Sequence, residues 1–176
     1  MTALLGNMGR EFDKTEEDAY INGDGATRPL GLLHPTAGAE VEVVINSSMS
    51  FDDVRALFFS LDAEYYRDTI WLMSGETALY LQTLKDSVGN YLWRDVDGTT
   101  LGCKVYTSPY MPQIGEENSP IFFGNFSYCW FMERGGIALK PPRELHALNS
   151  ATAFAGTALV DGRLVRQDAV KALMIA

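Results

Sequence analysis

Apolar side chains at helical spacing open the chain: Leu4, Leu5, Met8 and Phe12. Charged side chains occupy the other faces of the same segment. One apolar stripe at a period of 3.6 residues is typical of an amphipathic helix, so the pattern predicts a helix over residues 1–21. The run Asn22-Gly23-Asp24-Gly25 is expected to end this helix, because asparagine and glycine readily adopt the left-handed backbone found at helix ends.

Strands and a second helix are predicted next. The apolar runs 41–45 and 69–73 have the length and composition of short strands. Between them, Ser50 and Asp53 form the pattern of a capping box, in which each side chain bonds the backbone N–H of the other at a helix start. The helix that follows is expected to reach about residue 63. Its apolar face has the spacing i, i+3, i+4, i+7: Val54, Leu57, Phe58 and Leu61.

The second half of the chain changes from helical to β-rich patterns. A helix capped by Ser74 is expected to end near residue 85. Beyond it, turn residues separate four short predicted strands: 91–94, 104–107, 121–123 and 136–139. Residues 157–166 have the pattern of a hairpin that turns at Asp161-Gly162, and residues 167–175 are predicted to close the chain as a short helix. Helices early and a mixed sheet late indicate an α+β fold.

Charge and composition exclude several classes of function. The chain has 14 basic and 23 acidic residues and a net charge of −9, which opposes nucleic-acid binding through bulk electrostatics. Its two cysteines, Cys103 and Cys129, do not form a disulfide framework. The apolar runs are too short to predict a membrane span, and the first residues lack the apolar core of a signal peptide.

Catalytic and metal-binding patterns are sparse. The two histidines, His34 and His146, have no partners at the spacing of a triad or a zinc site. The run 22–25 resembles part of a calcium loop but lacks the remaining ligand positions. Carboxylates that meet only in the folded chain stay an open alternative. We therefore assign no catalytic, cofactor-binding or metal-binding residue, and we expect folding to be independent of metal ions.

Aromatic side chains crowd residues 65–131. Most are expected to form the core. A surplus of tyrosine and tryptophan is also typical of subunit interfaces, because these side chains combine a large apolar area with one polar group.

Six motifs, taken in order, resemble the major capsid proteins of tailed phages. The first is the helix end at residues 17–25 followed by Pro29-Leu30-Gly31-Leu32-Leu33, which is similar to the end of that family's long spine helix. The other five follow in the family's order: Trp71-Leu72-Met73 with Leu84-Lys85-Asp86-Ser87-Val88-Gly89-Asn90-Tyr91-Leu92, Leu101-Gly102-Cys103-Lys104-Val105, Met111-Pro112, Ile121-Phe122-Phe123-Gly124-Asn125-Phe126, and Asp161-Gly162-Arg163-Leu164-Val165 with Ala169. Lys104 stands where the family usually has proline, and Asn125 where it usually has aspartate.

The resemblance implies the capsid fold named after phage Hong Kong 97. This Hong Kong 97-like fold has an axial domain of mixed sheet and helices and a peripheral domain built on the spine helix and β-strands. Residues 1–32 would be the end of the spine helix in a partial peripheral domain. Residues 33–133 would form the axial domain, and residues 134–176 would return to the peripheral domain and close it.

The resemblance also concerns what precedes the matched region. Family members carry an N-terminal arm, an extended loop and the start of the spine helix ahead of it, and arm and loop join neighbouring subunits. Without them, we expect the stripe of the first helix to fray or to pair with another copy in a small oligomer, and closed shells not to form.

A structural subunit that acts by self-association is the function that the resemblance implies. Its partners would be copies of itself in hexamers and pentamers, with scaffold or portal proteins as further partners, in the virion and, before assembly, in the bacterial cytoplasm. Two alternatives stay open, an encapsulin-like cargo compartment and a small hydrolase on an unrelated α+β fold. The side chains expected at assembly interfaces are Leu4, Leu5, Met8, Phe12, Lys85, Asp86, Tyr91 and Trp93.

Overall fold

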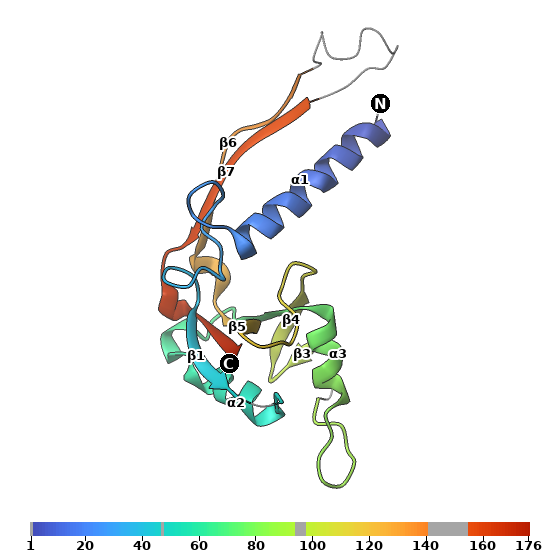
Figure 1. Ribbon diagram of the computed structural model, residues 1–176, viewed down its shortest axis with the longest axis vertical. Helices are drawn as coiled ribbons and strands as arrows, with labels where there is room; N and C mark the ends of the chain where they lie inside the picture. Colours follow the sequence, from blue (N-terminus) through green and yellow to red (C-terminus); the bar gives the residue numbers. More distant parts are fainter. Residues whose placement is uncertain (1, 47, 94–97, 141–154) are drawn as a thin grey trace.

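The chain folds into an elongated α+β structure. A computed structural model describes all residues except 1, 47, 94–97 and 141–154. A long helix and a two-stranded ribbon form one end of the molecule, and a sheet with shorter helices forms the other (Figure 1). The elements are α1 (Thr2–Asn22), β1 (Glu40–Ile45), α2 (Phe51–Ser60), β2 (Ile70–Met73), α3 (Gly75–Thr83), β3 (Thr99–Thr100), β4 (Cys103–Thr107), β5 (Asn118–Gly124), β6 (Cys129–Lys140), β7 (Ala155–Leu164) and β8 (Val170–Ile175), with 3-10 turns at Ala63–Tyr65, Phe126–Tyr128 and Gln167–Ala169.

The capping residues correctly predicted where helices α2 and α3 begin. Ser50 and Asp53 form the predicted capping box at the start of α2, and Ser74 accepts from the Thr77 N–H at the start of α3. Helix α2 ends at Ser60 and α3 at Thr83, two or three residues before the predicted ends. The predicted strand 91–94 is reduced to one bridge between Tyr91 and Lys85, and residue 94 lies outside the described part of the chain.

The main sheet has six strands in the order β1-β8-β5-β2-β4-β3. Strand β8 lies between β1, to which it is parallel, and β5, to which it is antiparallel. The prediction of a helix over residues 167–175 was therefore wrong. Val170–Ile175 is buried on both faces of the sheet, and a short apolar run of this kind fits a buried strand and a buried helix equally well in sequence.

The ribbon consists of β6 and β7, the longest strands, paired antiparallel. The predicted hairpin over 157–166 is wrong, because β7 runs straight through Asp161 and Gly162. Gly162 lies beneath α1 instead, where a Cβ atom would come within 2.8 Å of Phe131 Cδ1 and 2.9 Å of Tyr20 Cε1. Gly135 and Gly136 do not end a strand either: both have positive φ and form a bulge within β6.

Two apolar clusters hold the faces of the main sheet. On one face, Trp71 and Phe123 pack with their ring centroids 4.2 Å apart, against the buried side of α2. On the other, Phe122 and Val170 pack with Ile21 from the end of α1. Alternate side chains of β5 thus pack against α2 on one face of the sheet and against the end of α1 on the other. The division into axial and peripheral domains stays a prediction. It assigned residues 134–176 to the peripheral domain, whereas β8 is a strand of the six-stranded sheet.

Candidate assembly surfaces

A loop between α3 and β3 projects from the sheet end of the molecule (Figure 1). Asp86 organises it: its Oδ1 accepts from the backbone N–H groups of Val88 (2.9 Å) and Asn90 (2.8 Å). Lys85 Nζ lies 4.6 Å from the centre of the Tyr91 ring. Residues 85–90 form a turn after the end of α3, and the side chain at its tip, Val88, is 82% exposed. The loop therefore presents an apolar tip on an ordered base.

Asp86 should stay ionised, and so keep accepting these hydrogen bonds, at a lower pH than an ordinary aspartate. Hydrogen bonds from the backbone and side chain of Asn90 lower the pKa of Asp86 below its ordinary value. A carboxylate whose pKa is lowered by folding contributes stability above its unfolded pKa and loses it as the pH falls through the folded pKa. We expect the Val88 and Asn90 amide NMR signals to titrate below the usual aspartate range. A midpoint at the ordinary value would show that these bonds do not form in solution.

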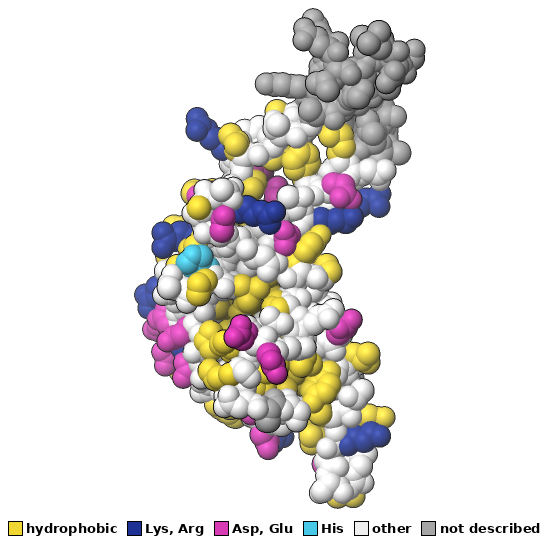
Figure 2. Space-filling model, in the orientation of Figure 1, with side chains coloured by type: hydrophobic (Ala, Val, Ile, Leu, Met, Phe, Trp, Pro, Cys, Tyr) yellow, Lys and Arg dark blue, Asp and Glu magenta, His cyan; other side chains and the backbone are white. Residues whose placement is uncertain are grey.

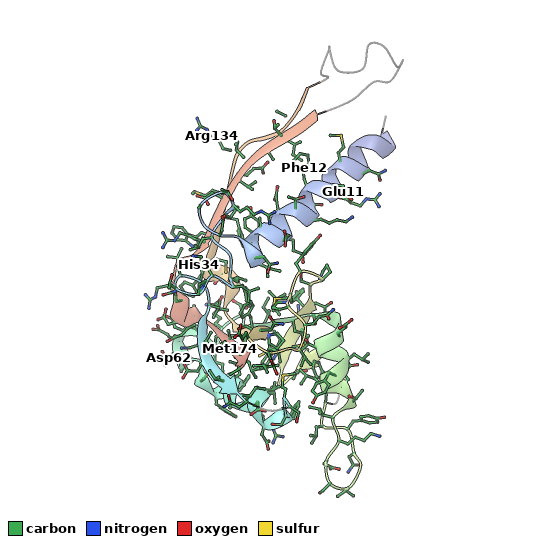
Figure 3. All side chains as sticks on the ribbon, viewed as in Figure 1. Glu11, Phe12, His34, Asp62, Arg134 and Met174 are labelled. Atoms are coloured by element: carbon green, nitrogen blue, oxygen red, sulfur yellow. The ribbon has the colours of Figure 1, made fainter. Side chains whose placement is uncertain are left out.

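Helix α1 already has a partner for part of its stripe. Phe12 and Met8 lie against Gly156 of β7, where a Cβ atom would come within 2.9 Å of Phe12 Cε2 and 3.0 Å of Met8 Cε. Phe12 points to the ribbon in Figure 3 and is half-buried. The expectation of an uncovered stripe thus fails for these two residues, since β7 covers them. The side chains of Leu4 and Leu5 lie outside the described part of the structure.

The ribbon also carries exposed apolar side chains that the sequence motifs did not predict as an interface. Trp130 and Met132 alternate with Phe131 along β6, and the Phe131 ring packs against Tyr20 of α1, tilted by 47° with centroids 4.2 Å apart. Trp130 and Met132 therefore lie on the ribbon face away from α1. Leu159, opposite Arg134 in the register, shares that face. We call Trp130, Met132 and Leu159 the outer ribbon face; they are 63%, 65% and 67% exposed.

Trp93 occupies a different environment from the other predicted interface residues. Its side chain is 6% exposed and belongs to the larger core cluster. Lys85 and Tyr91 are exposed, and Asp86 is half-buried. The structure brings these four residues to one end of the molecule, and their contact with a partner stays a prediction. On the face shown in Figure 2, apolar side chains gather over the same sheet end with acidic side chains among them.

Residues with catalytic potential serve turns in this structure. His34 Nδ1 accepts from the N–H groups of Thr36 and Ala37, and His146 lies outside the described residues. Asp24, the first carboxylate of the calcium-like run, accepts from the N–H groups of residues 26–28. Burial raises the pKa of Cys129 to about 12, which keeps its thiol protonated. Within residues 2–140 and 155–176, gaps aside, no group of three His, Cys, Asp or Glu side chains could hold a metal ion.

A polar cluster joins the turn before β8 to the turn after α2. Tyr65 donates to Asp168 Oδ2 (2.7 Å), and Arg166 donates to both Tyr65 (2.6 Å) and Asp168 (3.2 Å). It borders an open cavity of about 570 Å³. Each group already has a partner, so the cluster acts as a structural tie.

None of the described helices combines the length and the apolar character required to cross a membrane.

Known proteins resemble this chain in sequence and structure. The model of the phage capsid family matches residues 2–175. A capsid protein of a native GTA particle matches with a TM-score of 0.87 and 25% identity, over 99% of this chain and 65% of that chain. The capsid protein of an empty GTA particle matches with a TM-score of 0.84 and 25% identity, over 99% of this chain and 66% of that chain. No curated protein sequence matches the chain.

A more distant structure shares the fold. The protein of Mycobacterium phage Adephagia has a TM-score of 0.62 at 17% identity, over 99% of this chain and 64% of that one. The chain thus spans slightly less than two thirds of the length of the first structures it matches. The α+β architecture is the Hong Kong 97-like capsid fold, as the sequence motifs predicted. The chain belongs to the phage capsid family.

Proposed function

We propose that the chain is part of a structural subunit of a phage or prophage icosahedral capsid and that it acts by self-association, without catalysis. The family match over residues 2–175 is the observation that carries this proposal. Its partners are copies of itself in hexamers and pentamers, with scaffold or portal proteins as further partners. The subunit is made in the bacterial cytoplasm and ends in the virion, and its axial and peripheral domains follow the predicted boundaries except for β8.

Two exposed surfaces support self-association. The outer ribbon face carries a tryptophan, a methionine and a leucine, each more than half exposed, and the strand register places Arg134, Asp161 and Arg163 on the same face. Tryptophan, methionine and arginine are enriched at protein interfaces, where exposed apolar side chains rimmed by polar ones mark interaction sites. The loop that has Val88 at its tip and Tyr91 at its base is the second surface, at the opposite end of the molecule. Contacts at both ends would let one subunit bridge two neighbours.

Polar substitution of the outer ribbon face should weaken self-association. We expect the triple variant Trp130→Thr, Met132→Thr and Leu159→Thr to raise the dissociation constant at least tenfold, because it removes apolar area that association would bury. Threonine suits strands, so the fold should persist. Sedimentation equilibrium gives the constant, and electron microscopy shows whether the particles are small oligomers or shells.

The matched control is Phe59→Thr. This side chain is 76% exposed but lies on α2, away from the ribbon. It should leave association unchanged. Equal association of the triple variant and the wild type would contradict a role for the outer ribbon face, and a chain that stays monomeric at all concentrations would contradict self-association itself.

A further inference from the structure

The end of the main sheet has an apolar surface that lies outside both apolar clusters of the described residues. Val41 and Val44 of β1 are 44% and 53% exposed, and Met174 of β8, the register partner of Val44, is half-buried. Leu173 and Ile175 point to the α2 side of the sheet, so Met174 lies on the opposite face. Met174 is at the sheet end of the molecule, away from the ribbon (Figure 3). We call Val41, Val44 and Met174 the sheet patch.

Two carboxylates border the sheet patch. Glu116 and Glu117 are exposed, and neither forms an ion pair with any residue that the structure describes. Glu117 directly precedes Asn118, whose register partner, Ile175, adjoins the sheet patch. Asn118 Nδ2 donates to the Gln113 carbonyl at 3.2 Å, which orders the loop. The two glutamates are therefore held at the end of β8, beside the sheet patch.

The outer ribbon face has the opposite charge. Arg134 lies opposite Leu159 in the strand register. Arg163 lies opposite Trp130, so both arginines border the apolar side chains of this face. Asp161 lies on the same face, and two arginines with one aspartate leave it positive. Among the described residues, neither arginine forms an ion pair, so both can bind an acidic partner.

We propose that the outer ribbon face of one copy binds the sheet patch of a second copy. Each surface has an apolar centre, and the arginines that border one meet the glutamates that border the other. Opposite charges across an interface select the partner and fix the register of the contact. Since the two surfaces differ, each copy can use both at once, and such contacts build rings or open chains. This inference rests on the proposed self-association and names the two surfaces that meet.

The same charges oppose contacts between identical surfaces. Two outer ribbon faces would bring arginines against arginines, and two sheet patches would bring glutamates against glutamates. Like charges placed across an interface disfavour that pairing. The contact between the two unlike surfaces is therefore the one that the described charges favour.

Charge reversal on either surface tests the contact. Arg134→Glu with Arg163→Glu, and separately Glu116→Lys with Glu117→Lys, should each raise the dissociation constant of self-association about tenfold or more, because like charges then meet. An equimolar mixture of the two double variants should associate within about threefold of the wild type, since each ribbon then meets a patch of opposite charge. Sedimentation equilibrium measures all three constants.

The control is Arg55→Glu with Arg67→Glu. It changes the net charge by the same amount as the ribbon variant, on side chains of α2 and of the turn before β2 that are more than half exposed. Association of this variant should equal that of the wild type. An equal loss in the control would show that net charge, and not the outer ribbon face, governs association, and would overturn the contact.

Thermal melting followed by circular dichroism shows whether each variant keeps its fold. Where a charge reversal lowers the melting temperature, the neutral pair replaces it: Arg134→Gln with Arg163→Gln, or Glu116→Gln with Glu117→Gln. Each neutral pair should weaken association about threefold, because the attraction is lost and no repulsion takes its place.

The outcomes separate the two proposals. If either double variant associates like the wild type, or if the mixture does not recover, the contact between ribbon and sheet patch is wrong and self-association stands. If the wild type stays monomeric at all concentrations, self-association and this contact are both wrong.

Discussion

Gly124→Ala is expected to lower the free energy of unfolding by about 3 to 5 kcal/mol, at the upper end of single-substitution effects. A Cβ atom at this position would lie 2.2 Å from the Ala169 carbonyl oxygen and 2.6 Å from Val170 Cα. Both are backbone atoms at the point where β5 pairs with β8. The same carbonyl accepts from the Asn125 N–H at 2.9 Å, so it cannot move away without losing that bond.

Chemical denaturation followed by circular dichroism measures the effect. Gly9→Ala is the matched control: it lies within α1 with no atom within 4 Å of an added Cβ, and it should stabilise the helix by about 0.5 to 1 kcal/mol. A loss of less than 1 kcal/mol in Gly124→Ala would show that β5 and β8 can separate cheaply, which the register of the sheet does not suggest.

The motif around Gly124 shows what sequence reading could and could not provide. The resemblance placed Gly124-Asn125 after a buried strand, and the structure confirms the strand. It did not explain asparagine in place of the family's usual aspartate. Asn125 Nδ2 donates to the Arg67 carbonyl at 2.7 Å, while its Oδ1 accepts from the Ser127 N–H. An ionised aspartate would accept the second bond but could not donate the first.

Structural elements that are determined by neighbouring residues were predicted correctly, and elements that depend on partners distant in the chain were not. The caps at Ser50 and Ser74 are local, because cap and helix lie within four residues. The place of β8 depends on β1 and β5, more than 40 residues earlier in the chain. The outer ribbon face was missed for the same reason: the alternation of Trp130 and Met132 has meaning only once α1 is known to cover the other face.

The second large effect concerns a buried ion cluster in the main sheet. Lys171 of β8 has a side chain only 8% exposed, and its Nζ lies 2.5 Å from Glu40 Oε2 and 3.3 Å from Glu42 Oε2 on β1. Replacing both carboxylates, Glu40→Gln with Glu42→Gln, should cost about 3 kcal/mol, because it leaves a buried ammonium without a counter-charge. Lys171→Met should cost much less, since it removes the buried charge and leaves two carboxylates that are partly exposed.

The pH dependence of stability should differ in sign between wild type and the double variant. Burial lowers the pKa of Lys171, but hydrogen bonds and charges from Glu40 and Glu42 outweigh it and raise the pKa above the ordinary value of 10.5. The stability from this cluster is thus complete below pH 10.5 and is lost as the pH rises through the folded pKa. In the double variant burial acts alone and lowers the folded pKa, so stability should instead increase as the pH rises towards 10.5. Denaturation between neutral and alkaline pH, with Lys171→Met as the reference without a titrating group, distinguishes the two. Parallel curves for wild type and double variant would show that the carboxylates do not stabilise the lysine.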